Sequence, residues 1–340
     1  MKTTMRFAMN EWKNDLLTSG TRRAMPLVLL PGVAHLGKTV RDAVYTPEVQ
    51  ADAAMFLAEK YPTPAAIMMM DLSLEAEAFG AKVTIPEHDV PTVTEPCVND
   101  AESVQALCVP SLETTRIPVY LKATELMVRN YSAKPTLASC IGPLSLSARL
   151  IEITELMTSM MLEPEKTETL LEKATQFLLS YAAEYKKIGA NGILIAEPVA
   201  GLLSPELCEQ FSSRYVRRIV DALQDETFLV FLHNCGQSIP LLPSMQGTGA
   251  SGLSLGNAID IAEAVPQVAP TTIVLGNLDP VSVLQRSSAE DVRRAASERL
   301  AKTAPYAHHI LSSGCDMPYS TPLANIDAMF NAVDEFNAAR

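Results

Sequence analysis

FLVFLHNCG, residues 228–236, is an apolar run that ends in a histidine, a cysteine and a glycine. A continuous run of this length, bounded by a turn residue, is typical of a β-strand that is covered on both faces. Side chains two residues apart on a strand point to the same side, so His233 and Cys235 can face one ligand together. The segment therefore predicts a buried strand whose carboxyl end presents an imidazole and a thiol.

Similar runs recur along the chain, with helical patterns between them. They are PLVLLPG (26–32), AAIMMMD (65–71), PTLASCIGP (135–143), NGILIAEP (191–198), SGLSLGN (251–257), TIVLGNLDP (272–280) and HHILSSGCD (308–316). The stretches 163–188, 204–224 and 288–303 open with serine, proline or acidic residues, which are start signals of helices, and 321–339 is also predicted to be helical. Eight buried strands alternating with helices predict an α/β fold, a single (β/α)₈ TIM barrel.

Two segments fall outside this alternation. Residues 1–17 have the pattern of a short amphipathic helix and lack the apolar core of a signal peptide, so we expect an N-terminal helical extension. Residues 72–134 are longer than one crossover requires and contain the proline-rich VTIPEHDVPTVTEP. We expect one barrel over residues 1–340, with 72–134 inserted after the second strand as a lid or rim.

The composition narrows the classes of partner. The chain has 340 residues, 48% of them hydrophobic, a net charge of −12 and a pI near 5.0, which makes nucleic acid and anionic membrane surfaces poor partners. An apolar run of about 18 residues is absent, so no membrane span is expected. Six cysteines without an export signal predict a cytoplasmic protein with reduced thiols. P-loop, GxGxxG and GxSxG motifs are also absent.

Polar residues gather at the carboxyl ends of the predicted strands, where a TIM barrel carries its active site. They are His35, Asp71, Cys140, Glu197, His233, Cys235, Asn257, Asn277, Asp279, Cys315 and Asp316. Such a concentration is costly unless that end of the barrel holds solvent, a metal or a substrate.

Three of these residues suggest a metal site. Cys315 ends the last predicted strand, and the barrel can bring it to His233 and Cys235. One imidazole with two thiolates suits zinc, and three protein ligands leave a fourth position open for chemistry. The alternative is a core histidine with buried free thiols. Cys140 could compete as a ligand, but we interpret it as a small buried thiol.

The segment GNLDP (276–280) admits two interpretations. Asn277 or Asp279 could contact substrate, or the turn could simply end a strand and cap the next helix.

Several segments together resemble the uroporphyrinogen decarboxylase superfamily, whose fold is a (β/α)₈ barrel. They are MDLSLEAEAFGAKV (70–83), IGPLSL (141–146), AEPVAGLLSPE (196–206), HNCG (233–236), GNLDP (276–280) and SSGCDMP (312–318). The decarboxylase branch needs no metal and binds a tetrapyrrole with eight carboxylates through arginines near the first strand. The matching stretch here, LPGVAHLG (30–37), has no arginine, and only Asp71 matches a decarboxylase acid.

The second branch comprises the methylcobamide:thiol methyltransferases, typified by the coenzyme M enzymes of methanogens. Their zinc signature, H-x-C and a distant cysteine, is similar to His233, Cys235 and Cys315. The resemblance implies that a corrinoid protein carrying methylcobalamin docks over the barrel mouth and that a small thiol, such as coenzyme M, accepts the methyl group.

Further roles are assigned as hypotheses. Glu197 or Asp71 would hold the resting metal or take the thiol proton, and Asn277, Asp279 and His35 would bind substrate.

Three other functions stay open. They are corrinoid-dependent methyl transfer to tetrahydrofolate, uroporphyrinogen decarboxylation, and a non-catalytic scaffold that docks a corrinoid protein. The D-x-H-x-x-G pattern of corrinoid carriers is absent, so the chain is not expected to hold cobalamin permanently.

Overall fold

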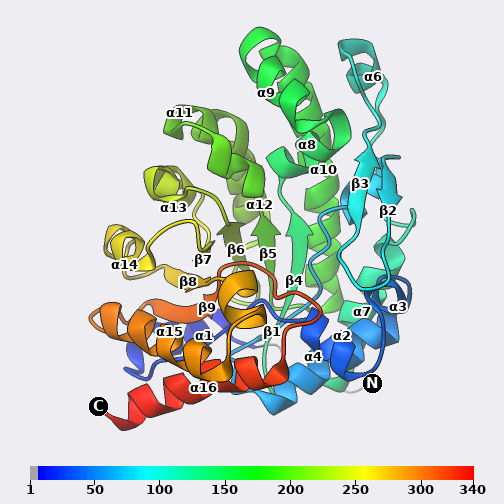
Figure 1. Cartoon of the computed structure of the whole chain (residues 1–340). Helices are drawn as coiled ribbons and strands as arrows, with labels where there is room; N and C mark the ends of the chain where they lie inside the picture. Colours follow the sequence, from blue (N-terminus) through cyan, green and yellow to red (C-terminus); the bar gives the residue numbers. More distant parts are fainter. Residues whose placement is uncertain (1–6) are drawn as a thin grey trace.

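A curled parallel sheet forms the centre of the computed structural model, which describes residues 7–340 (Figure 1). Its strands lie side by side in chain order, and each pairs in parallel with the next. They are β1 (Ala66–Ile67), β4 (Thr136–Ile141), β5 (Gly192–Ala196), β6 (Leu229–Asn234), β7 (Gly252–Leu255), β8 (Ile273–Leu278) and β9 (His309–Ser313). The predicted α/β class and barrel architecture are confirmed.

The first predicted strand, 26–32, is the exception. Ala24 makes only an isolated parallel bridge to Leu311, and helix α2 (Leu30–His35) begins inside the predicted run. Pro26 has no backbone N–H to donate to a ladder, and proline at the second position of α2 favours a helix start. The prediction of eight strands was therefore wrong here. An extended segment occupies the eighth position instead of a strand.

Helices cover the outside of the sheet. The longer ones are α4 (Pro47–Lys60), α7 (Ile117–Asn130), α10 (Pro164–Ile188), α12 (Arg214–Leu223), α15 (Ala289–Lys302) and α16 (Leu323–Ala338). Shorter helical segments are α3 (Val40–Tyr45), α8 (Pro143–Ile151), α9 (Ile153–Leu162), η1 (Pro198–Leu202), η3 (Ile239–Leu241), α13 (Leu242–Gly247), α14 (Ile261–Ala264), η4 (Val265–Gln267) and η5 (Pro280–Gln285).

The helix predictions from capping signals hold, with one interruption. The helix predicted at 163–188 matches α10, and Gly189, which follows the helix, has a left-handed conformation (φ 107°). Prediction 288–303 matches α15, where the Ser288 hydroxyl accepts the Asp291 N–H. Prediction 204–224 is divided into α11 (Pro205–Cys208), a π-helical turn η2 (Glu209–Ser213) and α12.

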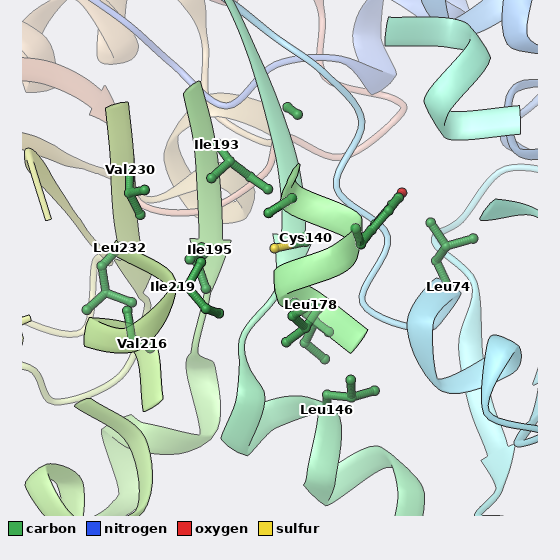
Figure 2. Close-up of a cluster of buried hydrophobic side chains, with 14 of the residues drawn as sticks. Leu74, Cys140, Leu146, Leu178, Ile193, Ile195, Val216, Ile219, Val230 and Leu232 are labelled. Carbon is green, nitrogen blue, oxygen red and sulfur yellow. The ribbon is translucent and has the colours of Figure 1, made fainter. Parts of the chain in front are cut away.

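Alternate strand residues face outward and form the main core with the helices. Figure 2 shows Ile193, Ile195, Val230 and Leu232 of β5 and β6 with Val216 and Ile219 of α12 and Leu178 of α10. Cys140 belongs to this outer layer, whereas Leu137 of the same strand faces the barrel interior. Because His233 has the inward register of Phe231, Cys140 and His233 lie on opposite faces of the sheet. This agrees with the interpretation of Cys140 as a buried thiol.

The amino-terminal end of the barrel is filled by α1 (Met9–Thr18), the predicted amphipathic helix. Met9 and Leu16 pack inside the barrel among Leu137, Leu194, Leu229 and Phe231. The Trp12 ring meets Phe231 edge-on, with 6.4 Å between centroids, and its indole N–H donates to the Pro64 carbonyl. Residues 1–6 of the prediction lie outside the described part of the chain.

The long segment 72–134 contains α5 (Leu74–Ala78), a hairpin of β2 (Lys82–Thr84) and β3 (Thr92–Glu95), α6 (Ala101–Ala106) and finally α7. Since α7 packs on α4, α10 and β4, it serves as the crossover helix between β1 and β4. The hairpin and α6 extend away from the sheet (Figure 1), and their role as a lid stays a prediction. Among residues 7–340, no helix has both the length and the apolar composition needed to cross a bilayer.

Candidate metal centre

The three predicted ligand residues come together at the carboxyl end of the barrel. His233 is the penultimate residue of β6, Cys235 follows that strand directly, and Cys315 follows β9. The strands are separated in the sheet by β7 and β8, and the curl of the barrel brings their ends to one place. The His233 ring nitrogen and the two Sγ atoms lie within 4.8 Å of one another.

The orientation of His233 is set by its neighbour on β7. Its Nδ1 atom lies 3.0 Å from the Ser254 hydroxyl. Its Nε2 atom is buried and has no hydrogen-bond partner. An unpartnered buried polar atom costs about 1–3 kcal/mol, so this nitrogen is suited to a partner of another kind.

The two thiols differ in acidity. The neighbouring Cys315 thiol, and after it the nearby His233 ring, lower the pKa of the Cys235 thiol. The hydrogen bond to Cys235, together with burial, raises the pKa of Cys315. Metal binding requires both thiols to be deprotonated, so a divalent cation between the two sulfurs would displace the proton that Cys315 retains.

The residues fit a tetrahedral zinc ion. Bonds of about 2.0–2.1 Å to nitrogen and about 2.3 Å to sulfur put neighbouring ligand atoms about 3.5–3.8 Å apart. The three ligand atoms already lie within 4.8 Å of one another, so they would have to move together by only about 1 Å to bind such an ion. An unpartnered imidazole nitrogen beside two cysteine sulfurs is a donor set that zinc takes.

Glu197 follows β5 as predicted, but its carboxylate is bound at the first turn of α8. It accepts hydrogen bonds from the Leu144 N–H (2.8 Å), the Ser145 N–H (3.1 Å) and the Ser145 hydroxyl (2.8 Å). Burial raises the pKa of Glu197 to about 7. The carboxylate completes the amino terminus of a helix, and its oxygens do not join the three-ligand group.

Asp71 follows β1 and is held in a buried ion pair. Its Oδ2 accepts from Arg116 (2.6 Å) and from the Tyr120 hydroxyl (2.7 Å), and its Oδ1 accepts from Ser73. Arg116 also pairs with Glu77 at 2.7 Å. Both Asp71 oxygens are therefore occupied by protein donors. The catalytic roles predicted for Asp71 and Glu197 stay hypotheses.

The three predicted substrate-binding residues have different surroundings. The Asn277 amide donates to the Gly256 and Ile259 carbonyls, and its Oδ1 is buried without a partner. Asp279 accepts the N–H groups at the start of η5 and the amide of the exposed Asn257. His35 stacks on Phe56, with ring centroids 4.0 Å apart. The capping interpretation of Asp279 is thus observed, and Asn277 keeps a free acceptor.

Two residues of the region, Ser254 and Glu75, are not among the polar residues that the sequence places at the strand ends. Ser254 pairs in register with His233, which was not known before the strands were aligned. Glu75 is 1% exposed. One of its carboxylate oxygens accepts a hydrogen bond from the Ile141 N–H, and the other has no partner. Burial raises the pKa of Glu75 to about 8. Asp316, next to Cys315, also has a buried oxygen without a partner. The sequence predicts consecutive strands at 228–236 and 251–257, and their neighbouring positions in a barrel could have placed Ser254 near His233.

Comparison with known proteins gives one family for nearly the whole chain. The sequence pattern of the family described as uroporphyrinogen decarboxylase (URO-D) matches residues 24–336. A methylcobamide:CoM methyltransferase of Methanosarcina acetivorans is 30% identical over 92% of this chain and 93% of its own length. A uroporphyrinogen decarboxylase of Coxiella burnetii is 28% identical over 86% of this chain and 82% of its own length.

A solved structure has the same fold. A methyltransferase from Methanosarcina mazei superimposes with a TM-score of 0.86 over 97% of this chain and 99% of that chain, at 24% identity. The likeness supports the barrel architecture despite the missing eighth strand.

Proposed function

The chain belongs to the uroporphyrinogen decarboxylase family, and we propose that it is a zinc-dependent methyltransferase. It would move a methyl group from a methylated corrinoid, carried by a partner corrinoid protein, to a small thiol such as coenzyme M. The observation that carries the proposal is the convergence of His233, Cys235 and Cys315 from two distant strand ends. The relative named methylcobamide:CoM methyltransferase supports the reaction class.

Three features of the chain argue against the decarboxylase alternative. Asp71 is the one residue that matches a decarboxylase acid, and here its side chain is fully buried against Arg116. Residues 30–37 have no arginine for a substrate with eight carboxylates. A decarboxylase would also have no use for a nitrogen and two sulfurs arranged for a metal.

The protein's own part in the reaction is to hold the ion and keep its charge balanced. The Cys235 and Cys315 thiolates together offset two positive charges, and His233 adds a neutral ligand. A zinc ion held by His233, Cys235 and Cys315 would supply a Lewis acid able to lower the pKa of an acceptor thiol from its usual value of about 8.5. Three protein ligands leave room for one external group, which is the condition for catalysis rather than a structural role.

The overall reaction balances without an added oxidant or reductant. The acceptor sulfur forms a bond to the methyl carbon, while the carbon–cobalt bond breaks and leaves its electron pair on cobalt. The thiol proton is released. Glu197 and Asp71 both accept several hydrogen bonds from the protein, so solvent at the mouth is the simplest destination for this proton. We place this chemistry in the cytoplasm, where thiols stay reduced.

The test combines metal analysis with a spectroscopic assay. The purified protein should contain about one zinc per chain and should demethylate methylcobalamin when a thiol is added. Cys235→Ser and Cys315→Ser should lose both zinc and activity. Cys140→Ala, which removes a thiol from the outer layer, should keep both.

Other outcomes would favour the alternatives. Activity with tetrahydrofolate but with no thiol would identify a folate enzyme, and formation of coproporphyrinogen would identify a decarboxylase. Binding of a corrinoid protein without turnover would indicate a scaffold. A fully active protein without metal would overturn the proposal.

A further inference from the structure

We propose that Ser254 is a positioning residue that makes Nε2 of His233 the metal-binding nitrogen. The inference rests on the proposed function only in assuming that the site holds a metal. Ser254 lies on β7 directly opposite His233 in the ladder between β6 and β7. Its hydroxyl is 3.0 Å from Nδ1, and the two residues are 0% and 1% exposed.

The hydrogen bond matters because a neutral imidazole has one N–H and one lone pair. With the proton on Nδ1, the N–H donates to the Ser254 oxygen and the Nε2 lone pair is free. With the proton on Nε2, that N–H would point to the place where a cation must sit. Nε2 is buried and without a partner, as expected if its lone pair is reserved for a metal.

Backbone geometry holds the pair in place. The chain segment of β7 that carries Ser254 pairs with β6 on one side and with β8 on the other, where Ser254 lies opposite Leu275. Pairing on both sides fixes the backbone of Ser254, so its Cβ atom stays beside the His233 ring. Sites built on rigid strands keep the narrow ligand geometry that metal binding needs.

A hydroxyl orients the ring without adding charge. Many metal-binding histidines donate to a carboxylate, which makes the imidazole more basic. Here two thiolates already balance a divalent cation, and a third negative charge would weaken its power to acidify an incoming thiol. Ser254 supplies the orientation and leaves the site electrically neutral. The choice of serine therefore suits a site whose task is thiol activation.

Metal affinity is the first readout, because it does not depend on turnover. Ser254→Ala should bind Zn²⁺ about 10–100-fold more weakly than wild type in competition with a chromophoric chelator. Ser254→Thr, which restores a hydroxyl, should recover most of the affinity. Ser251→Ala removes a serine from the other end of the same run, where it contacts Lys13, and should bind zinc like wild type.

A structural readout separates orientation from simple loss of stability. In ¹¹³Cd-loaded, ¹⁵N-labelled wild type, long-range ¹H–¹⁵N spectra should show cadmium coupled to Nε2 of one histidine and a proton on its Nδ1. Thermal melting of each apoprotein identifies variants that have lost the fold. Cadmium coupled to Nδ1 would overturn the inference without any variant.

The outcomes also distinguish this inference from the proposed function. Equal zinc affinity of wild type and Ser254→Ala would refute the role of Ser254 and leave methyl transfer untouched. Zinc binding that depends on Ser254, in a protein that transfers no methyl group to any thiol, would refute the proposed function alone. A wild type that binds no metal would overturn both.

Discussion

Gly256 lies directly against Cys235, so closely that a side chain at position 256 would overlap the Cys235 backbone. A Cβ atom there would stand 2.7 Å from the Cys235 carbonyl oxygen, nearer than real Cβ atoms approach. The Gly256 N–H also donates to the Asn234 carbonyl, at 2.9 Å, and the Asn277 amide donates to the Gly256 carbonyl. The loop after β7 thus forms a wall behind Cys235, one of the three candidate metal ligands.

The first prediction follows from this contact. Gly256→Ala should displace Cys235 and lower zinc affinity by at least tenfold, because changing a residue that supports a metal ligand typically lowers metal affinity about 10–100-fold. Gly247→Ala is the control, since the nearest atom there is the end of the flexible Arg217 side chain. Equal zinc content and affinity in both variants would show that a side chain at position 256 does not disturb Cys235.

Metal removal should change which thiols react. After treatment with a chelator, iodoacetamide should label Cys235, whose pKa is lowered, and added zinc should protect it. Cys108, which is exposed and outside the site, should react to the same extent in either state. Peptide mass spectrometry measures the labelling at each position. Unchanged labelling of Cys235 on addition of zinc would argue against its role as a ligand.

The buried ion pair of Asp71 should make a large contribution to stability. Arg116→Ala would leave Asp71 without its cation in a fully buried position, and we expect a loss of about 3–5 kcal/mol in the free energy of unfolding. The exposed pair of Arg218 and Glu172 provides a control, because Arg218→Ala should cost less than about 1 kcal/mol. Chemical denaturation of each variant measures the difference. Similar losses would show that Asp71 finds another partner.

Glu75 should make stability depend on pH. Burial raises its pKa from the usual 4.5 to about 8, so the folded protein binds the proton more tightly than the unfolded chain does. This contribution is fully present below pH 4.5 and is lost as the pH rises through 8, at about 1.4 kcal/mol per pH unit. Glu75→Gln, which keeps the acceptor for Ile141, should therefore gain stability relative to wild type between pH 5 and 8. A constant difference across this range would contradict the prediction.

The sequence predicted the convergence of His233, Cys235 and Cys315 better than the surroundings of the two carboxylates. His233 and Cys235 could be placed together because alternation along one strand is local, and Cys315 because all strand ends meet at one rim. The partners of Asp71 and Glu197 could not be predicted in the same way. Arg116 reaches Asp71 from the far end of the long segment after β1, and Glu197 meets α8, which follows a different strand.

The strand count failed for a different reason. Residues 26–32 have the apolar composition of a strand. Composition alone does not show that Pro26 lacks a backbone N–H donor or that Pro31 favours the start of a helix. The hydroxyl of Ser254 was also hidden, because its importance depends on cross-strand register and not on spacing along the chain.

The position of helix α1 restricts how small molecules can reach the candidate metal site. Trp12 and the buried residues Met9 and Leu16 of α1 pack among the inward-facing side chains and close the amino-terminal end of the barrel. Under the proposed function, a bulky methyl donor docked at the opposite rim would cover the candidate metal site. The small acceptor would then have to enter before the donor docks, and its methylated product would leave only after the donor dissociates, so the proposed catalytic cycle would have a compulsory order.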